Sequence, residues 1–120
     1  MSNKSLWSKK WFIKKGATDP PLYVQLVRED NNVPLNISGA SVSFTMKRHG
    51  ATNPVLDEVT ATLTDAVNGI IAYEWNSSPL TGTEKAGKFK AEFTITLSNG
   101  KIIKQPQNGY IEIYVVEDLS

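Results

Sequence analysis

The feature that most constrains the fold is a period-two alternation of apolar and polar side chains over residues 88–97. The apolar positions are Phe89, Ala91, Phe93, Ile95 and Leu97, and lysine, glutamate and threonine fill the places between them. Successive side chains of a β-strand point to opposite faces of the sheet, so this pattern predicts a strand with one buried and one solvated face. Residues 22–29, 41–48 and 59–65 alternate in the same way, and no window holds a sustained helical stripe.

Turn signals separate these stretches at short intervals. Asn-Gly pairs at 68–69 and 99–100 predict hairpins with type I′ turns, because both residues tolerate positive φ. Pro54 and Pro106 lack a backbone N–H, so the strands beside them should lie at sheet edges. Two segments that are apolar on both faces, 70–75 and 110–117, should be central. The predicted strands are 22–29, 41–48, 54–58, 59–65, 70–75, 88–97 and 110–117, with 101–105 as a short eighth.

Short strands at this spacing indicate an all-β fold, and we expect a single immunoglobulin-like antiparallel β-sandwich. A small barrel is the alternative. The length of 120 residues fits one domain, which we expect to comprise an extended N-terminal arm over 1–20 and the sandwich over 21–120. No apolar run approaches the roughly 20 residues of a membrane-spanning helix, so no membrane partner is expected.

Charge is distributed unevenly between the predicted arm and the body. The first fifteen residues hold five lysines and no acidic residue, whereas the other 105 hold eight basic and twelve acidic residues. Two of the three tryptophans also lie in this opening segment. A basic aromatic segment ahead of an acidic body is typical of an interaction tail. The candidate partner-binding residues are Trp7, Lys9, Lys10, Trp11, Phe12, Lys14 and Lys15.

Three functions compete for this segment. Its aromatic residues could anchor it on a protein partner while the lysines form a polar rim. It could instead bind nucleic acid through counterion release and stacking, but five lysines are few for such a tail. It could also be a plain terminus, or a strand whose aromatic side chains cover the domain's own core. We favour docking on a protein partner.

The sequence offers little for catalysis, metals or cofactors. It contains no cysteine and a single histidine, His49, in a polar turn, so thiolate sites and sites that need two imidazoles are excluded. We assign no catalytic residue, no cofactor and no metal ligand, and we expect a protein that is not an enzyme. Trp75 ends an apolar strand and is more simply a core residue, but with Tyr73 or Tyr110 it could form a platform for sugars.

Seven short segments follow one another in a characteristic order: FIKKG at 12–16, PPL at 20–22, LNISGASVSFTMK at 35–47, TDAVNG at 64–69, YEW at 73–75, AGKFKAEF at 86–93 and NGYIEI at 108–113. In this order and spacing they resemble the amino-terminal domain of the phage baseplate upper protein family. The loop after Trp75 and the residues around Pro106 depart from the family's pattern. The resemblance spans residues 12–119.

This resemblance implies a non-enzymatic bacteriophage virion protein, assembled in the host cytoplasm and built on an immunoglobulin-like module. Family members continue beyond this domain, whereas this sequence ends at Ser120. The expected place is therefore the tail, the baseplate, the neck or the capsid exterior. The expected partners are other virion proteins in a symmetric, multi-copy assembly. The alternative is a decoration module that binds carbohydrate on the host surface.

Overall fold

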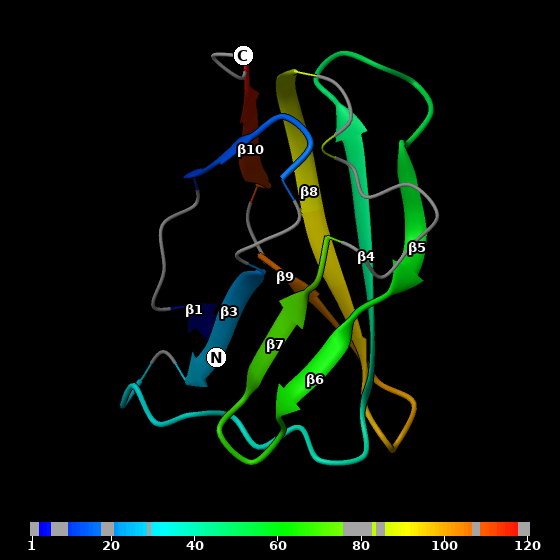
Figure 1. Ribbon diagram of the computed structural model, residues 1–120. Coiled ribbons are helices and arrows are strands. Elements are labelled where there is room, and N and C mark those ends of the chain that lie inside the picture. The colour runs from blue at the N-terminus through cyan, green and yellow to red at the C-terminus, as the bar shows by residue number, and fades with distance from the viewer. Residues whose placement is uncertain are drawn as a thin grey trace.

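The computed structural model of the chain is all-β, with ten strands and no helix among the residues that it describes (Figure 1). These residues are 3–5, by their backbone alone, and 10–17, 21–28, 30–75, 83, 86–106 and 109–117. The strands form two sheets that face each other, with principal extents of 44 × 27 × 25 Å for the molecule. The prediction of an all-β sandwich is confirmed, and the two separate sheets replace the alternative of a closed barrel.

The smaller sheet has four strands, each antiparallel to its neighbours, in the order β1-β3-β7-β6. They are β1 (Asn3–Ser5), β3 (Leu22–Arg28), β6 (Thr62–Asp65) and β7 (Ile70–Tyr73). As its apolar sequence predicts, β7 lies inside the sheet, between β3 and β6.

The larger sheet has six strands and contains the candidate functional surfaces. Its order is β2-β10-β8-β4-β5, and β9 pairs with the far part of the long strand β8. The strands are β2 (Lys10–Lys14), β4 (Ser41–Arg48), β5 (Leu56–Thr60), β8 (Gly87–Thr96), β9 (Ile102–Gln105) and β10 (Ile111–Val116). All described pairs are antiparallel except β2–β10, which is parallel.

The core lies between the two sheets and is built from the apolar positions of the alternating strands. Phe44 of β4 stacks on Tyr73 of β7, with ring centroids 4.4 Å apart, and so joins one sheet to the other. Trp75 meets Tyr73 edge to face at 5.0 Å. All three side chains are fully buried, as are Phe93 and Ile95 of β8. The period-two pattern therefore predicted the buried faces of β4 and β8 correctly.

The eight predicted strands correspond to β3 through β10. Their ends differ by at most two residues, except that β6 begins at Thr62, three residues after its predicted start at 59. Pro54 lies just before β5, the last strand of the larger sheet, and Pro106 lies just after β9, which pairs with β8 alone among the described strands. Both edge predictions are confirmed. β10 lies inside its sheet, between β2 and β8, as its apolar sequence predicts.

The turn type was predicted wrongly. Gly69 and Gly100 have φ values of 68° and 86°, but neither Asn68 nor Asn99 has positive φ, so neither turn is type I′. Each glycine instead ends a wider turn, in which its N–H donates to the carbonyl three residues earlier, that of Ala66 or Leu97. One left-handed residue suffices in this longer loop, and glycine supplies it.

The predicted arm is corrected over part of its length. Residues 10–14 are a strand of the larger sheet, β2, hydrogen-bonded in parallel to β10. The N–H of Lys15 continues this pairing by donating to the carbonyl of Val116, at 2.8 Å. Residues 3–5 form β1, which pairs with β3 in the other sheet. The segment that the sequence set apart from the sandwich thus contributes one strand to each sheet.

Candidate functional site

The alternation of β2 divides the candidate partner-binding residues between two faces. Trp11 and Ile13 point inward, where Ile13 is 6% exposed and Trp11 is half-buried against the core. Lys10, Phe12 and Lys14 occupy the outer face, and Phe12 is 64% exposed. Neighbouring residues of a strand point to opposite faces, so a partner on the outer face would reach Phe12 and the lysines but not Trp11.

The remaining candidates lie at the two ends of β2. Lys15 is exposed in the turn that follows the strand. Trp7 and Lys9 lie outside the described residues. The indole Nε1 of Trp11 is enclosed and has no hydrogen-bond partner among the residues that the structure describes. Trp11 therefore packs on the sandwich itself, which was one of the alternatives for this segment.

Phe12 is held in place by an aromatic contact across the parallel pair. It lies opposite Tyr114 of β10, and the two rings stack with centroids 4.8 Å apart and planes inclined by 14°. This offset-stacked contact contributes about 1 kcal/mol. The ring of Phe12 is thus positioned by its neighbour while most of its surface stays in contact with solvent.

Lys88 of β8 adds a cation–π contact to the stacked rings of Phe12 and Tyr114. Lys88 lies beside Tyr114 in the antiparallel pairing of β8 and β10, with its Nζ 5.7 Å from the centre of the tyrosine ring. The same Nζ lies 3.2 Å from Oε1 of Glu112. The hydrogen bond to Glu112 raises the pKa of Lys88 above its ordinary value of 10.5, and the charges of Tyr114 and Glu112 contribute in the same direction. Lys88 therefore stays protonated at physiological pH.

The electrostatic character of this outer face is basic. Four lysines, Lys10, Lys14, Lys15 and Lys88, lie on the strands and turn around Phe12 and Tyr114. Glu112 lies between Lys10 on β2 and the paired Lys88 on β8. Glu112 is the one carboxylate at the outward positions of β2, β10 and the facing end of β8, so the lysines leave a positive surface around a central aromatic ring. An acidic partner with an apolar pocket is complementary to it.

The sugar platform proposed for Trp75 is wrong. Trp75 and Tyr73 are fully buried and pack against each other and Phe44, so neither ring can stack on a ligand outside the sandwich. Tyr110 differs from them, because half of its side chain is exposed, at 50%. Only this part of the predicted platform lies on the surface.

Residues of the kind used in catalysis and metal binding are dispersed. His49 is exposed in the turn after β4, as expected for a loop residue. Within the described ranges, no group of three histidine, cysteine, aspartate or glutamate side chains is placed to hold a metal ion. The described part of the chain also contains no helix long and apolar enough to cross a membrane.

Comparison of the sequence with models of known protein families shows the family of this chain. The family model of the BppU N-terminal domain, the amino-terminal domain of the baseplate upper protein, matches residues 22–112. The chain belongs to this family. The match covers 91 of the 120 residues and includes β3 to β9 and the start of β10. No curated protein matches the chain.

Membership in the BppU N-terminal domain family confirms the resemblance drawn from the sequence. The family is a structural component of the phage baseplate, so the chain is a bacteriophage virion component. The two N-terminal strands β1 and β2 precede the matched residues. The family match therefore says nothing about the role of the basic aromatic face.

Sequence reasoning identified Phe12 and its lysines but missed the residues that position them. Tyr114 and Lys88 were assigned to strands, yet nothing in the sequence paired them with Phe12. The pairing depends on a parallel contact between segments about one hundred residues apart. The one available signal was a tyrosine, Tyr114, on a strand predicted to be central.

Proposed function

We propose that this domain is a non-enzymatic structural module that attaches to a neighbouring virion protein through the outer face of β2. Phe12 is the anchor, and Lys10, Lys14 and Lys15 form the rim. The observation that carries the proposal is the exposure of Phe12, 64%, on a ring already held by Tyr114. Exposed aromatic residues in a basic rim are typical centres of protein interfaces.

The energetics favour an anchor of this kind. Covering the exposed part of the Phe12 ring would contribute about 3 kcal/mol at 25 cal/mol per Å², before the costs of association. Those costs are reduced because the ring is stacked on Tyr114 and the backbone is fixed in a sheet. A preorganised side chain loses little conformational entropy on binding.

The charges indicate what the partner must offer. A basic rim around an aromatic ring is complementary to an apolar pocket bordered by aspartate or glutamate. We expect several copies to bind around a symmetric part of the particle, because a modest contact repeated in a ring gains avidity without any new interaction. The proposal differs from docking through a separate N-terminal arm, because here a strand of the sandwich presents the docking residues.

The test is incorporation of variant protein into phage particles. Phe12→Ser should reduce the amount of protein in purified particles by about tenfold or more, because the anchor is lost. Tyr23→Ser is the matched control, since Tyr23 is also an exposed aromatic residue on a strand, at 52%, but lies on the other sheet. Its incorporation should be unchanged.

A charge variant tests the rim separately. Lys14→Glu should lower incorporation while leaving the free domain folded, since Lys14 is exposed on the outer face. Circular dichroism and thermal unfolding of each free variant establish that the fold is intact. Normal incorporation of a folded Phe12→Ser protein would overturn the proposal.

A further inference from the structure

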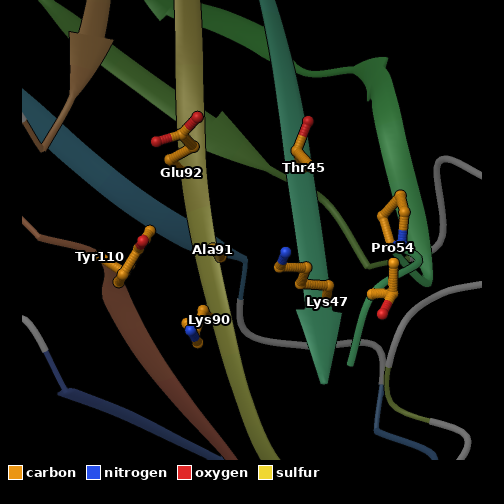
Figure 2. Close-up of a pocket in the computed structure, with 8 residues that line it drawn as sticks. Thr45, Lys47, Pro54, Lys90, Ala91, Glu92 and Tyr110 are labelled. Atoms are coloured by element: carbon orange, nitrogen blue, oxygen red, sulfur yellow. The ribbon is translucent and has the colours of Figure 1, made fainter. Parts of the chain in front are cut away.

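A second surface lies on the same sheet, away from β2. Along the strand pair β4–β8, the outer face is hollowed into two depressions of about 260 and 350 Å³. The first opens between the start of β10, β8 and β4, with Tyr110 on one side of β8 and Thr45 and Lys47 on the other (Figure 2). Neither depression touches the docking residues of β2.

Two lysines of like charge face each other across the first depression. Lys47 and Lys90 are direct partners in the antiparallel register of β4 and β8, and both line the hollow. Like charges opposite each other destabilise a sheet. Lys90 gains some compensation because its Nζ lies 4.9 Å from the centre of the Tyr110 ring and because its register partner on β10 is Glu112. A bound anion between the two ammonium groups would remove the repulsion.

The other residues that line this depression are not satisfied by a simple anion, because they need a ligand with further polar groups. Glu92, opposite Thr45, places a carboxylate in the same hollow, and the hydroxyls of Thr45 and Thr52 line it. Glu92 can only accept hydrogen bonds, so it needs a ligand that donates them. An acidic peptide brings a second carboxylate toward Glu92 and is disfavoured. A ligand that carries both an acid group and hydroxyl groups satisfies the lysines and Glu92 together.

Apolar surface completes the first depression. Tyr110 is half exposed, and Pro54 lies on the opposite wall. An aromatic ring and a proline offer a flat surface to the C–H groups of a pyranose. Few other small molecules combine an acid group, several hydroxyls and such a C–H face.

The second depression continues the first along the same strands. Five of its nine lining residues bear hydroxyl groups, and the other four are apolar. The first are Ser41, Ser43, Thr60, Thr94 and Thr96, and the second are Ala40, Val42, Ala61 and Leu63. The pair Ser43–Thr94 is the next pair on this face after Thr45–Glu92, so the two depressions lie end to end. Lys104 donates from its Nζ to Oγ1 of Thr94 at 3.0 Å and places a third cation at this end. The second depression thus extends the surface for a chain of hydroxyl-bearing units.

We propose that the β4–β8 face binds an acidic oligosaccharide. A sugar with a carboxylate or phosphate group occupies the depression of Lys47, Lys90 and Tyr110. The adjoining sugars lie along the serine and threonine hydroxyls. This function is additional to docking through β2, and it replaces the buried Trp75 platform with a surface that a glycan can reach.

The test is a nuclear magnetic resonance titration of the isotope-labelled full chain with four probes: glucuronate, glucose 6-phosphate, glucose and hexa-aspartate. The two acidic sugars should shift the amide signals around Lys47, Lys90 and Tyr110, and glucose should bind at least about tenfold more weakly. A hyaluronan tetrasaccharide should bind more tightly than glucuronate and extend the shifts to Ser43 and Thr94. Hexa-aspartate binding as tightly as the acidic sugars would overturn the proposal, as would no shift with either acidic sugar.

Variants with matched controls complete the experiment. Lys47→Gln and Tyr110→Ala should each weaken glucuronate binding about tenfold or more. Lys47→Gln also removes the like-charge contact, so the protein stays folded and lost binding cannot be ascribed to unfolding. The controls are Lys101→Gln, an exposed lysine in the turn before β9, and Tyr23→Ala, which is as exposed as Tyr110 but lies on the other sheet. Equal loss of binding in the controls would contradict the assignment.

Discussion

At the scale of single residues, close backbone packing decides which turns the chain tolerates. Gly69 has a φ of 68°, and a Cβ placed there would lie 2.6 Å from the carbonyl oxygen of Leu35 and 2.7 Å from that of Leu26. Gly100 has a similar φ of 86°, but nothing lies within 4 Å of its Cβ position. The sequence predicted both turns from the same Asn-Gly pair. The crowding at Gly69 comes from a loop distant in sequence and could not be predicted.

This difference gives a matched pair of substitutions. Gly100→Ala should cost about 1 kcal/mol of unfolding free energy, the strain of a left-handed alanine. Gly69→Ala should cost roughly 3 kcal/mol or more, because backbone carbonyls must also move. Urea denaturation of both variants measures the difference. Equal losses would show that the loop of Leu35 does not pack closely on this turn.

The pair Lys88–Glu112 predicts a pH dependence. The pKa of Lys88 is raised in the folded protein, chiefly by its hydrogen bond to Glu112, so folding favours the protonated amine. This stabilisation is fully present below the ordinary value of 10.5 and is lost as the pH rises through the higher folded pKa. Glu112→Gln should lower the Lys88 pKa and reduce the alkaline loss of stability. Side-chain amine titration by nuclear magnetic resonance measures the pKa, and an unchanged value in Glu112→Gln would refute Glu112 as the cause of the shift.

At the scale of strands, β3 to β10 were predictable because turn signals bound them. Four of the predicted strands alternate with period two, and those that became β7 and β10 are apolar on both faces. β2 was not, because its apolar residues Trp11, Phe12 and Ile13 are consecutive and do not alternate with polar ones. Its apolar and aromatic positions lie in a run of lysines, which indicated an arm, and its partner β10 begins about one hundred residues later. Parallel pairing between segments that are distant in the sequence produces no local sequence pattern from which it could be predicted. Composition therefore favoured the exposed lysines and Phe12 of this segment, whereas a strand whose aromatic side chains cover the domain's own core was an alternative that was not preferred.

The strand assignment of β2 predicts opposite effects for neighbouring residues. Ile13→Ala should destabilise the domain by about 2–4 kcal/mol, because it leaves a cavity in the core. Phe12→Ala should cost about 1 kcal/mol, the contribution of its stacking on Tyr114. Thermal unfolding of the two proteins tests this order.

Deletion of residues 1–15 should likewise destabilise the sandwich, because it removes β2 from the larger sheet. A separate arm could be removed without effect. Unaltered stability of the truncated protein would therefore contradict the assignment of β2 to the sheet.

At the scale of the whole molecule, the core of the sandwich could be predicted from the sequence, whereas its binding surfaces could not. Alternation identified the buried face of the strands that show it, and the position of Trp75 at the end of an apolar strand placed it correctly among the core residues. The surfaces depend on which strands become neighbours, and that depends on topology. Lys47 meets Lys90, and Phe12 meets Tyr114, only because β4, β8, β10 and β2 share one sheet.

The outer face of the larger sheet thus carries two proposed functions at separate places. Phe12 and its lysines on β2 would hold the domain to the particle, and the β4–β8 depressions would remain open to a glycan. Variants of one surface should leave the other intact. Phe12→Ser protein should still bind glucuronate, and Lys47→Gln protein should still enter particles, so failure of either proposal is distinguishable from failure of the other.

The most direct test of attachment through β2 is a particle reconstruction at side-chain resolution that includes this domain. We predict that Phe12 is covered by a neighbouring virion protein whose pocket is bordered by acidic residues, while Tyr23 on the other sheet faces solvent. A map in which Phe12 faces solvent and contact is made through another surface would contradict the proposal.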